Sequence, residues 1–222
     1  MTAEHDACKD GNAMVSAESC FVPAGEQRDE KICKILRESE EKAALWLDTP
    51  VGRMNSLLAP KDHIAMAANG SLIANFFNQV QLEASGADIS AASLANTVKG
   101  FEKEVRYRDV LANYIFPNTL KVIRVDRTVL KQALERCAEY FALLPDGSLT
   151  VSETFLKPIE QHFNYDYFYG IEAEIDVRKP VGERVVSICY QGAELDDNIH
   201  LTLSLNNYRA SGAGGYPFYS SC

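Results

Sequence analysis

The stretch that most constrains the fold is residues 200–217, because it starts with the pattern of a strand and ends with the composition of a loop. At its start every second residue is leucine: Leu201, Leu203 and Leu205. This period of two is typical of a strand that is buried on one face. The alternation stops at Asn206, and after Tyr208 comes a glycine-rich run that contains Gly212, Gly214 and Gly215. Glycines let a backbone approach a bulky group closely, so the stretch is either a strand with an ordinary turn or one wall of a binding site.

Helical patterns dominate the first part of the chain, and strand patterns dominate the last part. Apolar residues at three- and four-residue spacings predict helices over 29–47, 71–85, 107–114 and 127–143. Short or alternating apolar runs predict strands over 87–90, 119–125, 169–177, 184–190 and 200–207. We expect irregular structure over 1–24 and 91–104, and residues 53–70 show a mixed pattern. This order indicates an α+β fold, with helices first, then a strand–helix unit and then antiparallel strands.

The charge balance excludes one broad class of partner. The chain has 22 basic and 31 acidic residues, so its net charge is −9, whereas a nucleic-acid polymer needs a surface of clustered lysine and arginine. No stretch approaches the ~20 apolar residues that a membrane span requires. The first residues are polar and acidic and lack the features of a signal peptide. We therefore expect neither a nucleic-acid polymer nor a membrane as partner, and the compartment stays open.

The sequence contains no recognisable catalytic or metal-binding pattern. Hydrolysis needs a nucleophile with a base, or a metal that activates water. The chain lacks G-x-S-x-G, the phosphate loop G-x-x-x-x-G-K-[ST] and the clustered ligands of a two-metal phosphoesterase. Its six cysteines and four histidines are scattered without metal-ligand spacing. We expect no catalytic residue, metal or cofactor in this chain; Glu160 with His162 is a minor alternative, and Asp196 with Asp197 fits a solvated turn.

The sequence does contain a possible binding set. Phe116 and Asn118 flank a proline just before the strand predicted over 119–125, and Asn206 and Tyr208 lie at the end of the strand predicted over 200–207. If these strand ends are neighbours, the two rings could clamp a planar base between them, and such stacking contributes ~1–3 kcal/mol per base. The amides could then read the edge of the base, since each offers a donor and an acceptor. The other interpretation, in which Phe116 belongs to the core and Tyr208 to the surface, stays open at this point.

Three segments of the chain resemble one family in the right order. The motifs Tyr107-Arg-Asp-Val-Leu-Ala-Asn-Tyr-Ile-Phe-Pro-Asn, Asn164-Tyr-Asp-Tyr-Phe-Tyr-Gly and Asn206-Asn-Tyr-Arg-Ala-Ser-Gly-Ala-Gly-Gly-Tyr-Pro resemble the C-terminal domain of the 5′-nucleotidase family. The bacterial 2′,3′-cyclic-nucleotide 2′-phosphodiesterase/3′-nucleotidases are the more similar branch. The resemblance covers roughly 48–217. It implies mixed and antiparallel sheets with flanking helices, layered α/β/β/α.

The resemblance also implies a function, in which one domain binds the nucleotide and another domain hydrolyses it. In the family two aromatic rings sandwich the base of a nucleoside or nucleotide, and these positions are Phe116 and Tyr208 here. Asn118 matches an asparagine that contacts the base, and Gly212 and Gly214 belong to the loop that forms the wall of the site. The hydrolysis uses two divalent metals in an upstream metallophosphoesterase domain. Residues 1–47 are then expected to be the remnant of that domain with its connecting helix, and residues 48–222 the nucleotide-recognition domain.

The sequence departs from the family pattern in ways that keep an alternative open. The metallophosphoesterase domain is missing, and the chain stops soon after the glycine loop, as a truncated or split gene product would. The segment 94–101 lacks the glycine-rich, arginine-bearing loop of many relatives, and Lys99 is a weak substitute for that arginine. The relatives are exported or attached to the cell surface, whereas this chain shows no signal of its own. The alternative is a vestigial, non-catalytic interaction domain that no longer binds nucleotide.

Overall fold

The computed structural model describes residue 25 and residues 28–222. These residues belong to two units, one that ends at Trp46 and one that spans Leu47–Cys222. The irregular structure expected over 1–24 lies outside the described residues. The first predicted helix is confirmed as α1 (Glu30–Leu47), in which no residue is buried. The Asp29 carboxylate begins it by accepting hydrogen bonds from the backbone N–H groups of Lys31 and Ile32, at 2.8 and 3.1 Å. The origin of residues 1–47 in an upstream domain stays a prediction.

The second unit is built around a mixed four-stranded sheet with the order β4 (Leu120–Val125), β11 (Leu201–Asn206), β2 (Ile89–Ser93) and β7 (Asp166–Tyr169). Strand β11 pairs antiparallel with β4 and parallel with β2, which in turn pairs antiparallel with β7. Side chains on both faces of β11 are covered, because Ser204 and Asn206 are buried along with its leucines. The expectation that this strand would be buried on one face only is therefore wrong.

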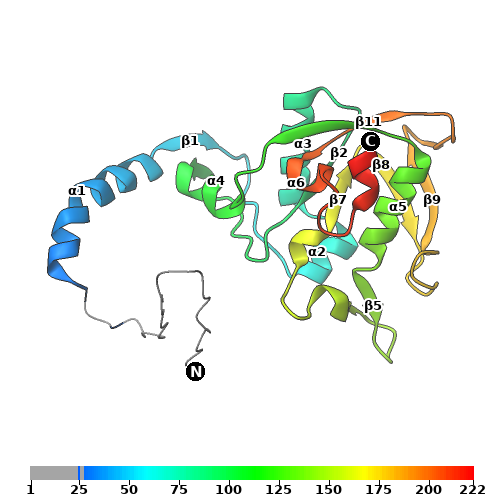
Figure 1. The fold of residues 1–222 in the computed structure, drawn as a ribbon, viewed down its shortest axis with the longest axis horizontal. Helices are drawn as coiled ribbons and strands as arrows, with labels where there is room; N and C mark the ends of the chain where they lie inside the picture. Colours follow the sequence, from blue (N-terminus) through cyan, green and yellow to red (C-terminus); the bar gives the residue numbers. More distant parts are fainter. Residues whose placement is uncertain (1–24, 26–27) are drawn as a thin grey trace, which may run out of the picture. The chain divides into compact units, whose positions relative to one another are not determined.

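Helices cover this sheet, and smaller sheets surround it (Figure 1). Helix α3 (Leu72–Ser85) contacts β2, β7 and β11, and α5 (Arg127–Ala138) contacts β4 and β9. A three-stranded antiparallel sheet has the order β10 (Ala193–Glu194), β9 (Val185–Tyr190) and β8 (Ile171–Ile175). Two-stranded sheets pair β1 (Pro50–Arg53) with β3 (Glu104–Arg106), and β5 (Phe141–Leu143) with β6 (Leu149–Val151). This arrangement has the predicted α+β class with mixed and antiparallel sheets.

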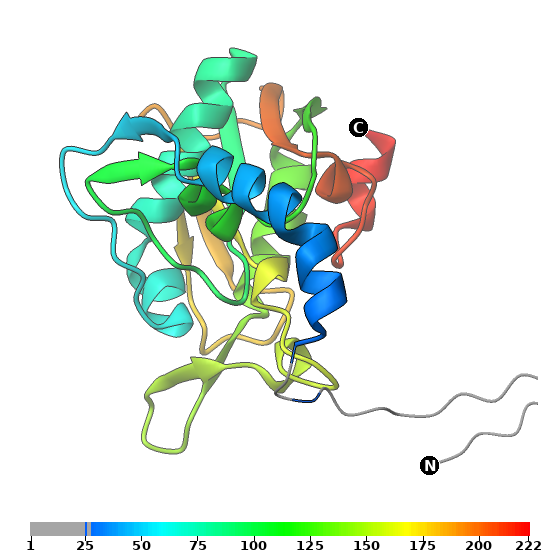
Figure 2. The ribbon, with the colours of Figure 1, turned by 90° about the vertical axis from the view of Figure 1, so that its left-hand side faces the viewer.

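Three predicted elements have other boundaries than expected. The helix predicted over 127–143 ends at Ala138, and residues 141–143 form β5 because the turn Pro145-Asp146-Gly147 folds the chain back onto β6. The resulting hairpin projects at the bottom of both views (Figure 1 and Figure 2). The loop expected over 91–104 begins inside β2 and ends at β3, because tertiary pairing extends both strands. The strand predicted over 169–177 is split at Gly170, whose φ of 93° lets the chain pass from β7 to β8.

The remaining short elements connect the sheets. Helix α4 (Tyr107–Asn113) is confirmed close to its predicted range. Helix α2 (His63–Asn69) was not predicted, because the pattern over 53–70 is mixed. Helix α6 (Asn207–Ala210) and the 3-10 turns η1 (Glu153–Phe155), η2 (His162–Asn164) and η3 (Pro217–Ser221) complete the fold. No helix in the described part of the chain is long and apolar enough to cross a membrane.

Two histidines from distant segments stack within this fold. The rings of His63, at the start of α2, and His162, at the start of η2, lie 4.0 Å apart and nearly parallel. The hydroxyl of Tyr140 lies 2.6 Å from His162 Nδ1, and His63 Nε2 lies 2.8 Å from the carbonyl oxygen of Asn96. Burial lowers the pKa of His162, the charge of His63 adds to this effect, and nearby Glu160 and Asp62 oppose it. A neutral His162 therefore suits the folded state.

This lowered pKa predicts that acidification destabilises the second unit. In the unfolded chain His162 binds a proton near its ordinary pKa of 6.5, so below that pH the unfolded state holds more protons than the folded state. The resulting stability is fully present above pH 6.5 and is lost as the pH falls through the lower folded-state pKa. Urea unfolding at pH 7.5 and at pH 5 measures the effect. We expect His162→Phe to reduce this pH dependence and the exposed control His200→Gln to leave it unchanged; an equal pH dependence in all three proteins would contradict the prediction.

Candidate functional site

The ends of two neighbouring strands bring together the segments that the sequence singled out. Strand β4 begins at Leu120, and this residue pairs with Asn206, the last residue of β11. Beyond that pair the two segments of the chain remain hydrogen-bonded, because the backbone N–H of Asn207 donates to the carbonyl oxygen of Thr119 at 2.8 Å. In return the backbone N–H of Thr119 donates to Asn207 Oδ1, also at 2.8 Å. The condition for a clamp, that the two strand ends are neighbours, is therefore met.

A cavity of about 250 Å³ opens at this junction. It is lined by Ser93, Phe116, Asn118, Phe163, Asn206 and Tyr208. The structure thus brings together four of the six residues that the sequence proposed for a ligand site. Phe116 is 46% exposed and Tyr208 is 42% exposed, so neither ring is buried in the hydrophobic core and both can contact a ligand. A cavity with aromatic rings, amides and a hydroxyl, and with no charged side chain in its lining, suits a flat and uncharged polar group.

The two asparagines of the cavity are held by their own surroundings. Asn206 is buried, and its Oδ1 accepts a hydrogen bond of 2.7 Å from the backbone N–H of Arg209, which makes Asn206 the N-cap of α6. The backbone N–H of Asn118 donates to the carbonyl oxygen of Phe116 at 2.8 Å, which closes a tight turn at Pro117. Burial raises the pKa of Tyr114, and a hydrogen bond with the side chain of Asn118 acts in the opposite direction. Both amides are therefore oriented before any ligand arrives.

Phe163 and Ser93 line the same cavity, and no sequence motif predicted either of them there. The ring of Phe163 meets that of Phe116 edge-on, with centroids 6.2 Å apart and planes at 62°. Phe163 comes from η2 and Ser93 from the end of β2, both far from Phe116 in the chain. The only signal for Phe163 is the run of aromatic residues that begins with it, and nothing local distinguishes Ser93 from other serines. Long-range strand order alone brings these two residues to the site.

The two predicted glycines, Gly212 and Gly214, follow Tyr208 closely in the sequence but do not line the cavity. A Cβ atom on Gly212 would lie 3.1 Å from the Cα atom of Pro217. A Cβ atom on Gly214 would collide with the guanidinium of Arg209 and with the side chain of Asn164. Both glycines have positive φ angles, 89° and 74°. Their missing side chains therefore make room for the protein's own atoms, and a contact between these glycines and a ligand stays a prediction.

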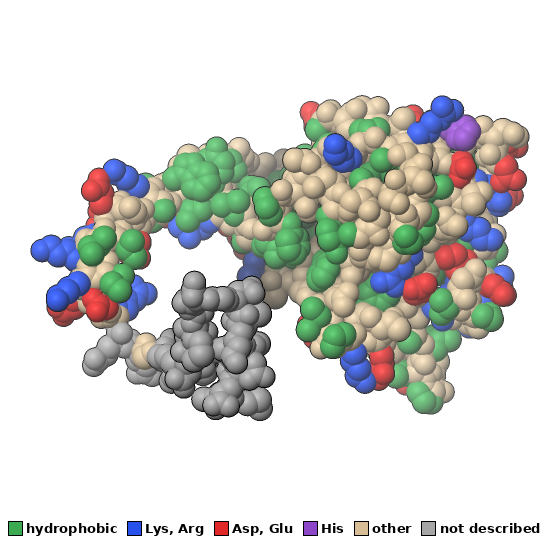
Figure 3. Space-filling view, in the orientation of Figure 1, with side chains coloured by type: hydrophobic (Ala, Val, Ile, Leu, Met, Phe, Trp, Pro, Cys, Tyr) green, Lys and Arg blue, Asp and Glu red, His purple; other side chains and the backbone are tan. Residues whose placement is uncertain are grey.

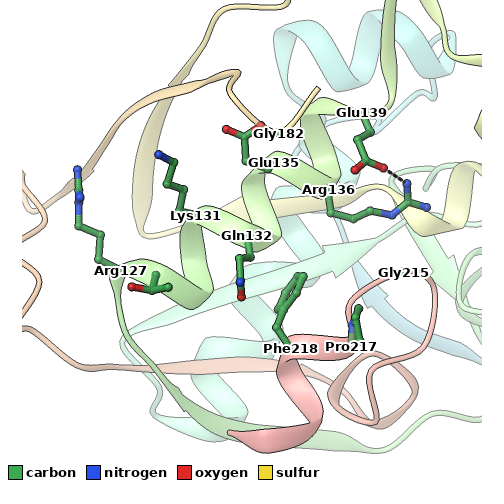
Figure 4. Close-up of a pocket in the computed structure, with 11 residues that line it drawn as sticks. Arg127, Lys131, Gln132, Glu135, Arg136, Glu139, Gly182, Gly215, Pro217 and Phe218 are labelled. Carbon is green, nitrogen blue, oxygen red and sulfur yellow. Dashed lines mark hydrogen bonds and ion pairs between the residues drawn. The ribbon is translucent and has the colours of Figure 1, made fainter. Parts of the chain in front are cut away.

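A larger cavity of about 440 Å³ lies along α5, next to η3 (Figure 4). Charged side chains line it, but most of them have partners within the chain. Arg127 contacts Glu194 at 3.1 Å and Asp197 at 3.3 Å. Arg136 contacts Glu139 at 2.6 Å, the ion pair that Figure 4 marks. Because most of these charges already neutralise one another, this cavity has fewer unpaired polar groups to bind a ligand. We therefore place the candidate site at the aromatic cavity.

Charge is unevenly distributed on the face that Figure 3 shows. Within the second unit, charged side chains gather on the right-hand side of the view, where β9 lies, whereas few charged side chains show around α6 (Figure 3). Among the described residues, no three histidine, cysteine, aspartate or glutamate side chains are grouped so that they could hold a metal ion. His162, the minor catalytic alternative, packs against His63 and Tyr140 instead. The site as described is suited to binding.

Comparison with known proteins identifies the second unit. A family model described as "5′-nucleotidase, C-terminal domain" matches residues 50–221. Among curated proteins, the 2′,3′-cyclic-nucleotide 2′-phosphodiesterase/3′-nucleotidase of Haemophilus influenzae is 25% identical over 217 residues, which cover 84% of this chain and 33% of the relative. The protein of the same name from Yersinia enterocolitica is 27% identical over 140 residues, 58% of this chain and 21% of the relative. The chain thus spans a third or less of the length of these relatives.

Solved structures show the same fold. A Staphylococcus aureus protein named as a 5′-nucleotidase, solved in complex with alpha-ketoglutarate, is 35% identical and superposes with a TM-score of 0.81. The match covers 93% of this chain and 40% of the other. The 5′-nucleotidase precursor of Thermus thermophilus is 17% identical, with a TM-score of 0.64 over 85% of this chain and 35% of the other. The predicted α+β fold and the resemblance stated from three motifs are confirmed.

Proposed function

Since the chain belongs to the 5′-nucleotidase C-terminal domain family, we propose that it binds a nucleoside or nucleotide by stacking the base between Phe116 and Tyr208. The single observation that carries this proposal is the cavity at the β4–β11 junction, where both exposed rings meet two oriented asparagines. A base is planar and apolar on its faces but polar at its edge, so rings for the faces and amides for the edge match its chemistry.

We assign hydrolysis to a different domain. The relatives' names describe cleavage of phosphate esters of nucleotides, and the family resemblance implies two divalent metals in a metallophosphoesterase domain. The described residues do not fit such metals, because no three potential ligands are grouped. In this proposal the chain recognises the nucleoside part of the substrate and serves nucleotide catabolism. The domain that carries the metals belongs either to a longer protein or to a separate partner.

Calorimetric titration of the chain with adenosine, AMP and 2′,3′-cyclic AMP tests the proposal. We expect weak, saturable binding with a Kd of about 1 mM or tighter, which corresponds to about −4 kcal/mol or better, because stacking on two rings contributes most of the free energy. Ribose 5-phosphate, which has no base, is the matched control and is expected to give no binding. An absence of heat with every nucleoside at several millimolar would favour the alternative, a vestigial domain that has lost the ligand.

A further inference from the structure

The cavity is backed by an arginine that does not line it. Arg209 follows Tyr208 in α6 and is only 1% exposed, one of the largest fully buried side chains of the described residues. Burial of a guanidinium is costly unless its donors find acceptors, and the group has five N–H donors in a fixed planar arrangement. The hydrogen-bond partners of this buried arginine therefore decide how it is stabilised next to the candidate ligand site.

Five acceptor atoms surround the guanidinium, one for each of its donors. The carboxylate of Asp166 takes two of them, with Nε to Oδ2 at 2.8 Å and Nη2 to Oδ1 at 2.9 Å. The carbonyl oxygen of Phe163 accepts from Nη2 at 2.9 Å and that of Ala213 accepts from Nη1 at 3.0 Å. Asn164 Oδ1 accepts from Nη1 at a longer 3.4 Å. Because every donor has an acceptor and the carboxylate is held at two points, the guanidinium orients all four partner groups at once.

Burial disfavours each charge of this pair, and the opposite charge of the partner favours it. Burial acts to lower the pKa of Arg209, but the charge and hydrogen bonds of Asp166 together with the nearby Tyr216 and Cys137 outweigh burial, so the net shift is upward. Burial also raises the pKa of Asp166, and the charge and hydrogen bonds of Arg209 oppose that shift. The guanidinium lies 4.2 Å from the centroid of the Tyr216 ring, which adds a cation–π contact. The bidentate contact at 2.8 and 2.9 Å indicates an ion pair at neutral pH.

These partners belong to three separate segments around the cavity. Tyr208 and Arg209 are neighbours in α6, Phe163 lies in η2, and Ala213 lies in the glycine loop. Gly214 leaves the space that the guanidinium occupies, because a Cβ at that position would collide with it. One side chain thus links the segment with the Tyr208 ring to the segment with the Phe163 ring, and both rings line the cavity. Moving the guanidinium would change the distance between the two segments.

We propose that Arg209 is a positioning residue of the aromatic cavity: its guanidinium holds the backbone of Phe163 and the glycine loop at a fixed distance from Tyr208. Because the Phe163 ring packs edge-on against Phe116, this also sets the distance between Phe116 and Tyr208, the width of the slot for the base. This proposal rests on the proposed function. It assigns Arg209 no contact with the ligand. Its consequence is that changes to the shape of the side chain weaken base binding even where its positive charge is kept.

Arg209→Lys tests the proposal because lysine keeps the charge opposite Asp166 but cannot reach the carbonyl oxygens of Phe163 and Ala213 together. Arg136→Lys is the matched control. Arg136 also points to the glycine loop, with Nε and Nη2 each 3.4 Å from the Gly214 carbonyl oxygen, and it stacks on Phe155 at 4.2 Å, but it does not line the aromatic cavity. Arg136→Lys also removes guanidinium contacts to the glycine loop, so an effect that came only from losing contacts to that loop would change both proteins.

The readout is the Kd for AMP by calorimetry, at a temperature where both variants are folded, together with the NMR contacts between the labelled Phe116 and Phe163 rings, whose centroids lie 6.2 Å apart. We expect Arg209→Lys to raise the Kd about tenfold, a loss of about 1.4 kcal/mol, and to shift those contacts, while Arg136→Lys changes neither. If Arg209→Lys does not fold, Asp166→Glu takes its place in the experiment, because it moves the same guanidinium and keeps both charges. An unchanged Kd and unchanged ring contacts in the folded variant would overturn the positioning role while the proposed function stands. An absence of binding by the unmodified chain would overturn both.

Discussion

Replacement of both Phe116 and Tyr208 by alanine is expected to weaken nucleotide binding about a hundredfold, because each base–ring contact contributes ~1–3 kcal/mol and each 1.4 kcal/mol is a factor of ten. Both side chains are nearly half exposed, so their truncation removes little buried surface and creates no core cavity. The melting temperature of the double variant is therefore expected to stay close to that of the unmodified chain. The combination of lost binding with retained stability is the signature of a ligand-contacting pair.

The measurement is a calorimetric titration with AMP and a thermal melt on the same samples. Tyr190→Ala is the control, because Tyr190 is a partly buried aromatic residue on β9 that does not line the aromatic cavity. We expect it to leave the Kd unchanged. If the double variant binds AMP as well as the unmodified chain, the base does not lie between these rings. If the double variant instead unfolds several degrees earlier, the rings serve the fold, as the vestigial alternative requires.

Patterns that are continuous in the sequence were sufficient to predict several elements. The helix expected from Ser71 is α3, where Ser71 Oγ accepts from the backbone N–H of Ala74 at 3.3 Å, and Gly86 ends it with a φ of 66°. The strands before and after the candidate site, β4 and β11, were also predicted, and Phe116 and Tyr208 lie just outside them. Each of these signals needs only a short window of residues.

The parts that sequence reasoning missed depend on contacts between distant segments. Phe163 reaches the cavity because η2 precedes β7, and β7 pairs with β2 in a register that no local pattern specifies. Arg209 gave no signal, since an arginine in a polar turn is expected at the surface and its partner Asp166 is 43 residues away. The helix predicted over 127–143 was too long because residues 141–143 pair with β6 as a strand. In all three cases a contact outside the local pattern decides where the residue lies or which element it joins.

The largest expected effect on stability is that of Asp166→Ala. Asp166 is 3% exposed and supplies two of the five acceptors of Arg209. Its removal leaves a guanidinium that is buried without a counter-charge, and the loss of one partner of a buried pair costs about 3–5 kcal/mol. That is a large fraction of the ~5–15 kcal/mol by which domains are stable. Urea unfolding followed by circular dichroism measures it, with the midpoint expected to fall and the slope to stay the same.

Two further variants separate the buried charge from the lost contacts. Asp176→Ala removes a carboxylate with the same bidentate geometry, since Arg178 donates to Asp176 from Nε at 2.8 Å and from Nη2 at 2.9 Å, but the Arg178 side chain is 80% exposed. Water can solvate the arginine that remains, so we expect a much smaller loss of stability there. Arg209→Met added to Asp166→Ala removes the unpaired charge and is expected to recover part of the stability. A double variant that is less stable than Asp166→Ala alone would show that the neutral contacts of Arg209, rather than its unpaired charge, account for the loss.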